Sequence, residues 1–455
     1  MRRERTVLAM GFLLEAERGG GIRLLYTDGE RVERRDGKTI LTYGTMGSFT
    51  TVELSDGPGE CRITRSALGG NQDVYYLERA DKSYVFTSLK LLPRIGFQCR
   101  FTGDEKLIAE FIYNGFIRTR DTLVRDVFKL LPNEYLEIAA GKVRTLVSPR
   151  IQPAPRGDSE LSLARMYEVE KSIFDRYIDF ALEKDSRVNI ALSGGFDSNL
   201  LLHFLAERRI PVRAFCVGGV RGLDETEMAA LLCEHNGNAV FCKGEVSREV
   251  RGEMRRIAEI LEGSLYERGI FLQYVLSKLL RENNVHYILL GECADQVFNR
   301  NFYCEKAPAF LTNYVDNPYE LGTMVVLKKS VLMLGALGVA GLYPFADVRM
   351  QELGAAVMDE NGTSKEKQKR MCLACFDDFT RGLVEKNPGS TALKALFQDD
   401  SEEADFIKLV QETNEFYNPG FRISHKYGPE ESELDYYLCL EYLKAFKQVF
   451  CEHEP

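Results

Sequence analysis

The chain has 455 residues, of which 45% are hydrophobic and 28% are charged, a composition that predicts a soluble globular protein with two or three domains. Its net charge of -9 and its pI near 5.4 argue against non-specific binding to nucleic acid, which needs a basic face. The eleven cysteines are scattered without the spacing of a disulfide framework, which suits a reducing compartment.

Residues 1–147 are predicted to form a β-rich domain, because short runs of β-forming residues alternate there with turn signals. The basic start, Met1–Arg5, is followed by charged residues and glycines rather than by the apolar core of a signal peptide. The predicted strands are Thr6–Leu14, Ile22–Tyr26, Val74–Leu77, Tyr84–Thr87 and Pro132–Val143 with a turn at Gly141; further turns are Asp36-Gly37 and Asp56-Gly57, and the helix is Asp104–Asn114.

Residues 148–160 are predicted to be a linker, since three prolines within 148–159 exclude a helix or a central strand. Residues 161–455 form the second predicted domain. Its predicted strands are Val188–Leu192, Val212–Val217, Ala239–Cys242 and Val285–Leu290, and its predicted helices are Leu161–Leu182, a segment ending near Arg208, Glu225–His235, Gly269–Glu282, Ser364–Asp377 and Ser432–Phe450. Beyond about Phe302 the pattern predicts mostly helix and no further strand.

Strands that are apolar on both faces and alternate with helices indicate an α/β fold, with a parallel sheet covered by helices on each side. In such sheets, ligands bind beyond the carboxyl ends of the strands. Two unusual stretches follow predicted strands, residues 192–198 and residues 290–295. A ligand site is therefore expected where these two stretches meet.

The first stretch is Leu192-Ser193-Gly194-Gly195-Phe196-Asp197-Ser198. Adjacent glycines let the backbone approach an anion, and a turn that enters a helix N-terminus directs free N–H groups at it. The stretch therefore predicts a phosphate cradle. The carboxylate of Asp197 would repel a phosphate unless a divalent cation lies between them. The alternative interpretation of Asp197 is an ordinary helix N-cap.

The second stretch, Leu290-Gly291-Glu292-Cys293-Ala294-Asp295, repeats the pattern of a strand end, a glycine and carboxylates. Asp295 is predicted to join Asp197 at the cation, with Glu292 facing the same crevice. The alternative is that Glu292 and Asp295 are solvated loop residues. The spacing of Cys372 and Cys375 within a helical pattern is attributed to packing rather than to a metal or redox site.

The motif Ser-Gly-Gly-Phe-Asp-Ser resembles the SGGxDS pyrophosphate loop of the ATP pyrophosphatase enzymes. With Gly-Glu-Cys-Ala-Asp-Gln-Val-Phe at 291–298, it is similar to the asparagine synthetase family, where the second motif commonly reads SGEGADE. Residues 214–218, which include Val217 and precede Asp224, resemble the family's adenine-binding strand, and 343–347 resemble its PFLD segment. Residues 63–69, 74–76 and 86–90 look like the body of a class II glutaminase domain, and 129–132 like its exit.

The resemblance implies an Ntn glutaminase-like β-rich domain, followed by a HUP-like ATP pyrophosphatase domain with a helical C-terminal part. It implies an enzyme that uses ATP and Mg²⁺ to adenylate a carboxylate, releases pyrophosphate and passes the acyl group to an amine. The residues implied for ATP and pyrophosphate are Leu192, Ser193, Gly194, Gly195, Asp197, Ser198, Val217, Leu290 and Gly291. Asp197 and Asp295 would hold the metal, and Glu292 would accept a proton from the attacking amine. The family's adenylation lysine matches Lys386 best, with Lys394 as the alternative.

Several positions depart from the family pattern. Glutamine-using members carry cysteine directly after the initiating methionine, whereas this chain has Arg2, and the family's NGE segment has no counterpart. The first domain is therefore expected to lack glutaminase activity and to have a structural or docking role. Gln296 replaces a usual acid, which weakens the metal prediction slightly.

These observations predict an amide ligase that acts on a small-molecule or peptide carboxylate and amine, as the lasso-peptide cyclases do, and not on nucleic acid. β-Lactam synthetase is disfavoured because it has tyrosine where this chain has Glu292. The alternatives are an ammonia-dependent asparagine synthetase, a different reaction on the same scaffold such as nucleotide thiolation, or a non-catalytic module that binds a partner protein. The apolar tail, Tyr436–Phe450, is expected to pack on the body or on a second chain as a homodimer.

The expected location is the cytoplasm, with no membrane association. The longest apolar run, Val331–Ala346, contains glycines and a proline and falls short of the ~20 residues that a membrane span requires.

Overall fold

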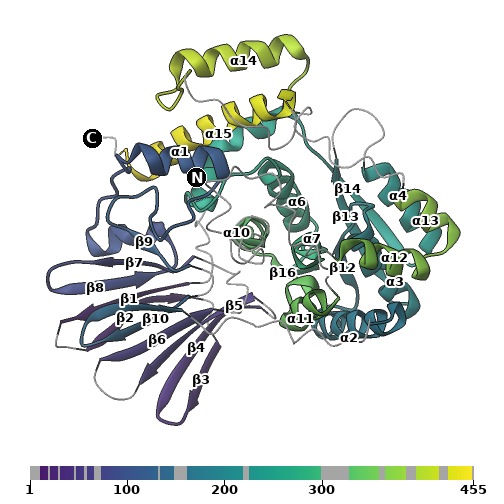
Figure 1. The fold of residues 1–455 in the computed structure, drawn as a ribbon, viewed down its shortest axis with the longest axis horizontal. Helices are drawn as coiled ribbons and strands as arrows, with labels where there is room; N and C mark the ends of the chain where they lie inside the picture. Colours follow the sequence, from purple (N-terminus) through teal and green to yellow (C-terminus); the bar gives the residue numbers. More distant parts are fainter. Residues whose placement is uncertain are drawn as a thin grey trace.

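The computed structural model is shown in Figure 1, and its two halves have different architectures. The half that comes first in the chain contains two antiparallel sheets, and the second half contains a parallel sheet with helices. The residues that the structure describes are 11–18, 21–28, 31–45, 48–55, 59–65, 73–131, 134–147, 161–218, 225–298, 327–357, 364–385, 396–419 and 429–452. The predicted linker, residues 148–160, lies outside these ranges.

The β-rich half consists of a five-stranded sheet in the order β2-β1-β8-β7-β9 and a six-stranded sheet in the order β11-β10-β6-β5-β4-β3. The strands are β1 (Gly11–Glu17), β2 (Ile22–Asp28), β3 (Arg31–Arg35), β4 (Lys38–Thr45), β5 (Ser48–Ser55), β6 (Glu60–Arg65), β7 (Tyr75–Glu78), β8 (Lys82–Phe86), β9 (Phe128–Lys129), β10 (Glu134–Ala139) and β11 (Lys142–Val147). The predicted turn at Gly141 joins β10 and β11, and this glycine has a positive φ of 72°.

Alternation along β1 explains how the two sheets pack. Phe12 and Leu14 belong to the core between the sheets, together with residues of β4, β5, β6, β8 and β10. Leu13 points to the other face and joins the large core that continues into the second half. Because successive side chains of a strand face opposite sides, one apolar strand can serve both cores.

Two helical segments complete this half: η1 (Leu89–Ile95) and α1 (Glu105–Asn114). The predicted helix Asp104–Asn114 is confirmed as α1, with Asp104 as its N-cap. Gly115 ends α1 in the left-handed region, at a φ of 79°, where a side chain would collide with the backbone of Tyr266.

The second half is built on a five-stranded parallel sheet in the order β14-β13-β12-β15-β16. Its strands are β12 (Val188–Ala191), β13 (Val212–Gly218), β14 (Ala239–Glu245), β15 (Tyr287–Leu289) and β16 (Ala340–Leu342). In Figure 1, α3 (Phe196–Glu207) and α4 (Glu225–Asn236) lie on one side of this sheet and α6 (Ile270–Glu282) on the other. The predicted α/β class with a parallel sheet is confirmed.

The remaining helical segments of this half surround the sheet and extend beyond it. They are α2 (Leu163–Leu182), η2 (Arg248–Glu253), α5 (Met254–Leu261), α7 (Ala294–Phe298), α10 (Lys328–Ala336), η4 (Pro344–Ala346), α11 (Val348–Ala356), α12 (Lys365–Cys375), α13 (Asp378–Val384), α14 (Asp400–Thr413) and α15 (Pro429–Phe450).

One prediction about this half is wrong. The region beyond Phe302 was expected to add no strand, yet β16 pairs in parallel with β15 at the edge of the sheet. β16 has only three residues, Ala340–Leu342, inside an apolar run whose pattern does not distinguish strand from helix. Its pairing is set by contact with β15 rather than by local sequence.

Buried polar contacts join the two halves. The carboxylate of Glu262 accepts hydrogen bonds from Ser88 Oγ and from the Leu89 backbone N–H, both at 2.5 Å. Asp73 forms an ion pair with Lys328 of α10, and these side chains are 3% and 7% exposed. Separating the halves would leave buried charges without partners, so these contacts fix one half against the other.

Helix α15 packs against α1 and α5, and therefore against both halves. Tyr442 stacks on Phe111 of α1 with 5.9 Å between the ring centroids. The apolar residues predicted for this tail, which are Tyr437, Leu438, Leu440, Leu443, Phe446 and Phe450, are all buried. The structure thus places this apolar face on the body of the chain.

Candidate active site

The two stretches singled out in the sequence meet at the centre of the parallel sheet. β12 and β15 are neighbours, with Ile190 paired to Leu289, and the strand order runs outward from them in opposite directions. Such a reversal of strand order opens a crevice beyond the strand ends. Residues 192–198 and 290–295 follow these two strands, and residues of both stretches line that crevice.

The loop after β12 is held in shape by its own hydroxyl groups. Gly194 has a φ of 75°, which favours glycine, and Gly195 is the N-cap residue of α3. Ser198 Oγ lies 3.2 Å from the Ser193 N–H and 3.2 Å from Ser193 Oγ, and it donates to the Gly195 carbonyl at 3.2 Å. This closed loop precedes the N-terminus of a 12-residue helix, the arrangement expected of a phosphate cradle.

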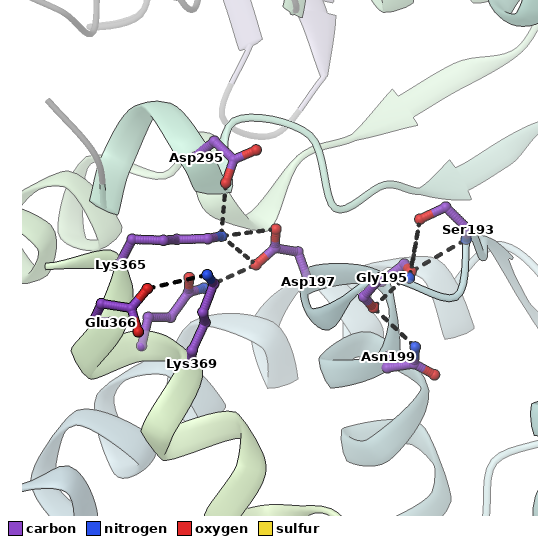
Figure 2. A network of polar contacts seen from close by, with 10 residues as sticks. Ser193, Gly195, Asp197, Asn199, Asp295, Lys365, Glu366 and Lys369 are labelled. Atoms are coloured by element: carbon purple, nitrogen blue, oxygen red, sulfur yellow. Dashed lines mark hydrogen bonds and ion pairs between the residues drawn. The ribbon is translucent and has the colours of Figure 1, made fainter. Parts of the chain in front are cut away.

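Asp197 does not cap its helix, so the alternative interpretation of this residue is wrong. The N-cap, Gly195, makes no side-chain cap bond, and the Asp197 carboxylate instead points toward α12 (Figure 2). Lys365 Nζ lies 3.1 and 3.0 Å from its two oxygens, and Gln368 Nε2 donates to it at 3.1 Å.

The same lysine ammonium also contacts the second predicted metal ligand. Lys365 Nζ lies 2.9 Å from an oxygen of Asp295, which stands in the first turn of α7 (Figure 2). Asp197 and Asp295 therefore both contact the ammonium group of Lys365, and the predicted divalent cation at these carboxylates stays a prediction. Asp295 lies in a helix rather than in a loop, and its side chain is 46% exposed.

Burial and charge oppose each other around this ion cluster. Burial raises the pKa of Asp197 above its ordinary value, and Asp295 adds to this effect while Lys365 counteracts it. Burial alone would lower the pKa of Lys365, but the two carboxylates hold it above its usual range. Glu170 of α2 is fully buried beneath the cluster, and burial followed by the charge of Asp197 raises its pKa strongly.

Gly291 brings the two strand-end stretches into contact. A Cβ at this position would lie 3.2 Å from the Ser198 backbone nitrogen and 3.3 Å from the Asp197 carbonyl carbon. These distances are tighter than ordinary van der Waals contact, and backbone atoms cannot move aside as a flexible side chain can. Glycine at 291 therefore permits the close approach that places Glu292 beside the loop.

Gly291→Ala is expected to weaken ATP binding severalfold, because the added methyl group pushes the Ser193–Ser198 loop from its position, and to destabilise the fold by about 1 to 3 kcal/mol through overpacking. Isothermal titration with ATP and thermal melting measure the two effects. Gly382→Ala is the matched control, since nothing lies within 4 Å of a Cβ there. Equal ATP affinity in both variants would contradict the close-approach argument.

A cavity of about 320 Å³ opens between the loop and helix α6. Most of the sequence-predicted site residues line it: Leu192, Ser193, Gly195, Asp197, Ser198, Val217, Leu290, Gly291 and Glu292. Gly194 and Asp295 also belong to the predicted set but do not line the cavity. The cavity reaches the end of β13 at Val217, where the sequence predicts the adenine side of a nucleotide site.

Glu292 has a charged neighbourhood that extends to α10. Burial raises the pKa of Glu292, nearby Lys329 opposes this shift, and Glu267 and Asp295 reinforce it. Lys329 Nζ lies 2.6 Å from Glu267 Oε1 and also lines the cavity. The following residue, Cys293, has a φ of 77°, a strained conformation for a residue with a side chain. A carboxylate next to a strained backbone position therefore stands near the ammonium group of Lys329.

Sequence reasoning missed four polar residues of this site: Lys365, Gln368, Lys329 and Gln273. Lys365 and Gln368 lie three residues apart on the face of α12 that also carries the buried Met371 and Cys372. That spacing was a usable signal, but the run Lys-Glu-Lys-Gln-Lys resembles an exposed helix start. Gln273 is 5% exposed and lines the cavity, and within the described residues its Nε2 has no hydrogen-bond partner.

Some sequence predictions cannot be placed in the site. Lys386, its alternative Lys394, and Asp224 lie outside the described residues. Cys372 and Cys375 are free thiols, and no group of three or more His, Cys, Asp or Glu residues in the described ranges is arranged to hold a metal ion. Asp347 of the segment resembling PFLD caps α11 through a 3.0 Å bond from the Arg349 N–H.

The sequence was compared with models of known protein families. The model of the family described as asparagine synthase matches residues 171–403, more than half of the chain. The chain belongs to the asparagine synthase family. The match contains both strand-end stretches, the cavity and Lys365, and it excludes the β-rich half. No significant relative matches among curated proteins.

Membership assigns the chain to a family of ATP-dependent amidotransferases and ligases that form carbon–nitrogen bonds. This agrees with a glycine loop and carboxylates at the strand ends of the synthase region. Among the described residues, no helix combines the length and apolar character needed to cross a membrane.

Proposed function

We propose that this asparagine synthase family member is an ATP-dependent amide ligase that adenylates a substrate carboxylate, releases pyrophosphate and transfers the acyl group to an amine. The observation that carries this proposal is the convergence of Asp197 and Asp295 on the ammonium group of Lys365 beside the glycine loop, with Glu292 in the adjoining cavity. Anion cradle, cation site and proton acceptor are the three elements that adenylation followed by aminolysis requires.

The glycine loop and the two carboxylates would bind different parts of the Mg²⁺–ATP substrate. The glycine loop and the α3 N-terminus would face the pyrophosphate, where the helix dipole favours negative charge. Asp197 and Asp295 suit Mg²⁺, a hard cation that prefers carboxylate and phosphate oxygens, and when bound it would neutralise the leaving pyrophosphate. Lys365 already balances these carboxylates. It is positioned to serve the role for which the sequence suggested Lys386.

Glu292 is suited to take the proton from the attacking amine. It lines the cavity next to Gly291, and burial raises its pKa toward the range in which a carboxylate is an effective general base. Lys329, paired with Glu267, keeps a positive charge nearby that favours the ionised form of Glu292. Gln273 also lines this cavity.

We also propose that the β-rich half does not hydrolyse glutamine. In the part of this half that the structure describes, the cysteines are Cys61 and Cys99. Burial raises the pKa of Cys61 to about 12 and that of Cys99 to about 11, so neither provides a thiolate near neutral pH. The contacts of Ser88 and Asp73 with the second half support a structural role instead.

The acid and the amine are proposed to be a dedicated small-molecule or peptide pair, in the cytoplasm, as for the lasso-peptide cyclases. An ammonia-dependent asparagine synthetase is the second candidate, favoured by the carboxylate Glu292 at its usual family position. A non-catalytic module that binds a partner protein or a second copy is the third. The ion cluster argues against it, because a scaffold gains nothing from carboxylates gathered beside an anion site.

Phosphorus NMR of the purified protein with ATP and Mg²⁺ separates these candidates. Aspartate with ammonium, then aspartate with glutamine, then extract of the producing cells are added in turn. Signals of AMP and pyrophosphate that grow only with extract are the expected result. Growth with aspartate and ammonium would identify an asparagine synthetase instead. No AMP under any condition, together with no ATP binding, would contradict the ligase proposal and favour the non-catalytic one.

A further inference from the structure

Lys365 occupies the point at which the two proposed metal ligands converge. It is the first residue of α12, and its Nζ lies 3.1 and 3.0 Å from the two oxygens of Asp197 and 2.9 Å from Asp295 Oδ1 (Figure 2). The Lys365 side chain is only 13% exposed. A largely buried ammonium group therefore stands where the sequence predicts a divalent cation.

A divalent metal ion needs the same carboxylate oxygens at a shorter distance. Mg²⁺ is coordinated by oxygens at about 2.1 Å, whereas the ammonium contacts here are 2.9 to 3.1 Å long. Because both oxygens of Asp197 contact Lys365, an ion that takes either oxygen would come within about 5 Å of Nζ. Two cations that close repel each other strongly in a partly buried site. Tight metal binding therefore requires the ammonium group to leave.

The start of α12 is anchored independently of the Lys365 side chain. The preceding residue, Ser364, is 4% exposed, and its N–H donates to the Phe298 carbonyl at 2.7 Å. One turn further along α12, Gln368 Nε2 donates to Asp197 at 3.1 Å. The helix backbone and Asp197 thus have supports other than the ammonium group. The flexible stem of the lysine can move while these supports remain.

The protein offers few further ligands to a metal ion at this point. Within the ranges that the structure describes, no group of three or more His, Cys, Asp or Glu residues is arranged to hold one. Two carboxylates leave most of the coordination sphere of Mg²⁺ to water and phosphate oxygens. We propose that Lys365 is an internal counter-ion that excludes Mg²⁺ from Asp197 and Asp295 until ATP is present, so that metal and nucleotide bind together.

The charges of the cluster explain why ATP would release Lys365. A metal ion that bound alone would separate the ammonium group from both carboxylates, which is costly for a largely buried charge. ATP brings negative charge with the metal, so Lys365 can exchange its carboxylate partners for phosphate oxygens. By linkage, ATP should then tighten metal binding and the metal should tighten ATP binding. This release rests on the proposed ATP site, whereas exclusion of the metal by Lys365 is measurable without ATP.

Electron paramagnetic resonance of Mn²⁺, titrated into the full chain without nucleotide, tests the exclusion, because Mn²⁺ takes the same oxygen ligands as Mg²⁺. Lys365→Met has a side chain of similar length but no charge, and is expected to bind Mn²⁺ about tenfold more tightly than wild type or better. The titrations are run at about pH 8, because burial raises the pKa of Asp197 and a protonated carboxylate binds no metal. Equal Mn²⁺ affinity in both proteins would overturn the proposal.

Two further variants separate the charge of Lys365 from other effects. Lys365→Arg keeps the positive charge, so its Mn²⁺ affinity should stay near that of wild type. Lys369→Met removes a charge from the same helix, where the lysine is 38% exposed and pairs with Glu366, and it should also resemble wild type (Figure 2). An increase in either variant as large as that in Lys365→Met would overturn the assignment to the Lys365 ammonium group.

Thermal melting keeps the proposal testable if Lys365→Met is unstable. Mn²⁺ alone should raise the melting temperature of this variant, whereas wild type should need ATP and Mn²⁺ together. A variant that melts early and is not stabilised by Mn²⁺ would overturn the proposal. Failure of ATP to bind wild type in the presence of Mn²⁺, with tight Mn²⁺ binding by Lys365→Met, would refute the proposed function and the release by ATP, but would support the exclusion of the metal by Lys365.

Discussion

Replacing Asp197 with alanine is expected to reduce AMP formation by about 10²- to 10³-fold, the size of effect seen when one preorganised charge-stabilising group is lost. Asp197 is one of two carboxylates that converge on the cation position, and its partners Lys365 and Gln368 point at it from α12. Without it, Lys365 retains Asp295 alone, and one of the two proposed metal ligands is lost. The measurement is AMP release with the substrate pair found by phosphorus NMR.

The fold of this variant is checked by circular dichroism and thermal melting, since loss of activity through unfolding would say nothing about the metal. Asp179→Ala is a suitable control on the neighbouring helix α2. Its side chain is 61% exposed and pairs with Arg208 at the surface, and such pairs contribute little to stability. Wild-type AMP release by a folded Asp197→Ala protein would refute the assignment of Asp197 to the metal.

The loop at residues 192–198 could be predicted because its determinants are local. A strand, two glycines, hydroxyls and the start of a helix are contiguous in the chain, and each constrains the backbone of its neighbours. The position of Asp295 beside Asp197 also followed from sequence, because strands in a parallel sheet place their carboxyl ends at one edge. The two residues lie close together because β12 and β15, the strands that precede them, are neighbours in the sheet.

Lys365 could not be predicted in the same way. It stands 168 positions from Asp197 in the chain, and only the packing of α12 against α2 and α3 brings the two together. Lys328 and Lys329 could not be predicted either. These adjacent lysines of α10 pair with different carboxylates: Lys328 with Asp73 of the β-rich half, and Lys329 with Glu267 at the candidate active site. Nothing local distinguishes these two ammonium groups from each other or from surface lysines. Tertiary contacts, unlike turns, are not encoded in a short window.

Glu292→Gln is expected to separate the two half-reactions. The amide keeps the shape of the side chain but cannot accept a proton, so amide formation should fall by about 10²- to 10⁴-fold, the usual contribution of a general base. Adenylation needs the glycine loop and the cluster of Asp197, Asp295 and Lys365. The Glu292→Gln substitution removes no group from either. Exchange of labelled pyrophosphate into ATP should therefore persist in this variant, while product measured by mass spectrometry disappears. Parallel loss of both activities would show that Glu292 positions ATP rather than accepting the proton.

The dependence on pH provides an independent check of the same role. Only the ionised carboxylate is a base, and burial raises the pKa of Glu292 above its ordinary value. Wild-type amide formation should therefore be lost as pH falls through this raised pKa, and should rise to a plateau above it. Glu292→Gln has no group that titrates at that position, so its residual rate should lack this acid limb. An acid limb of kcat/KM that survives the substitution would assign the titration to another group, and the proton acceptor would have to be sought among the remaining carboxylates of the cavity.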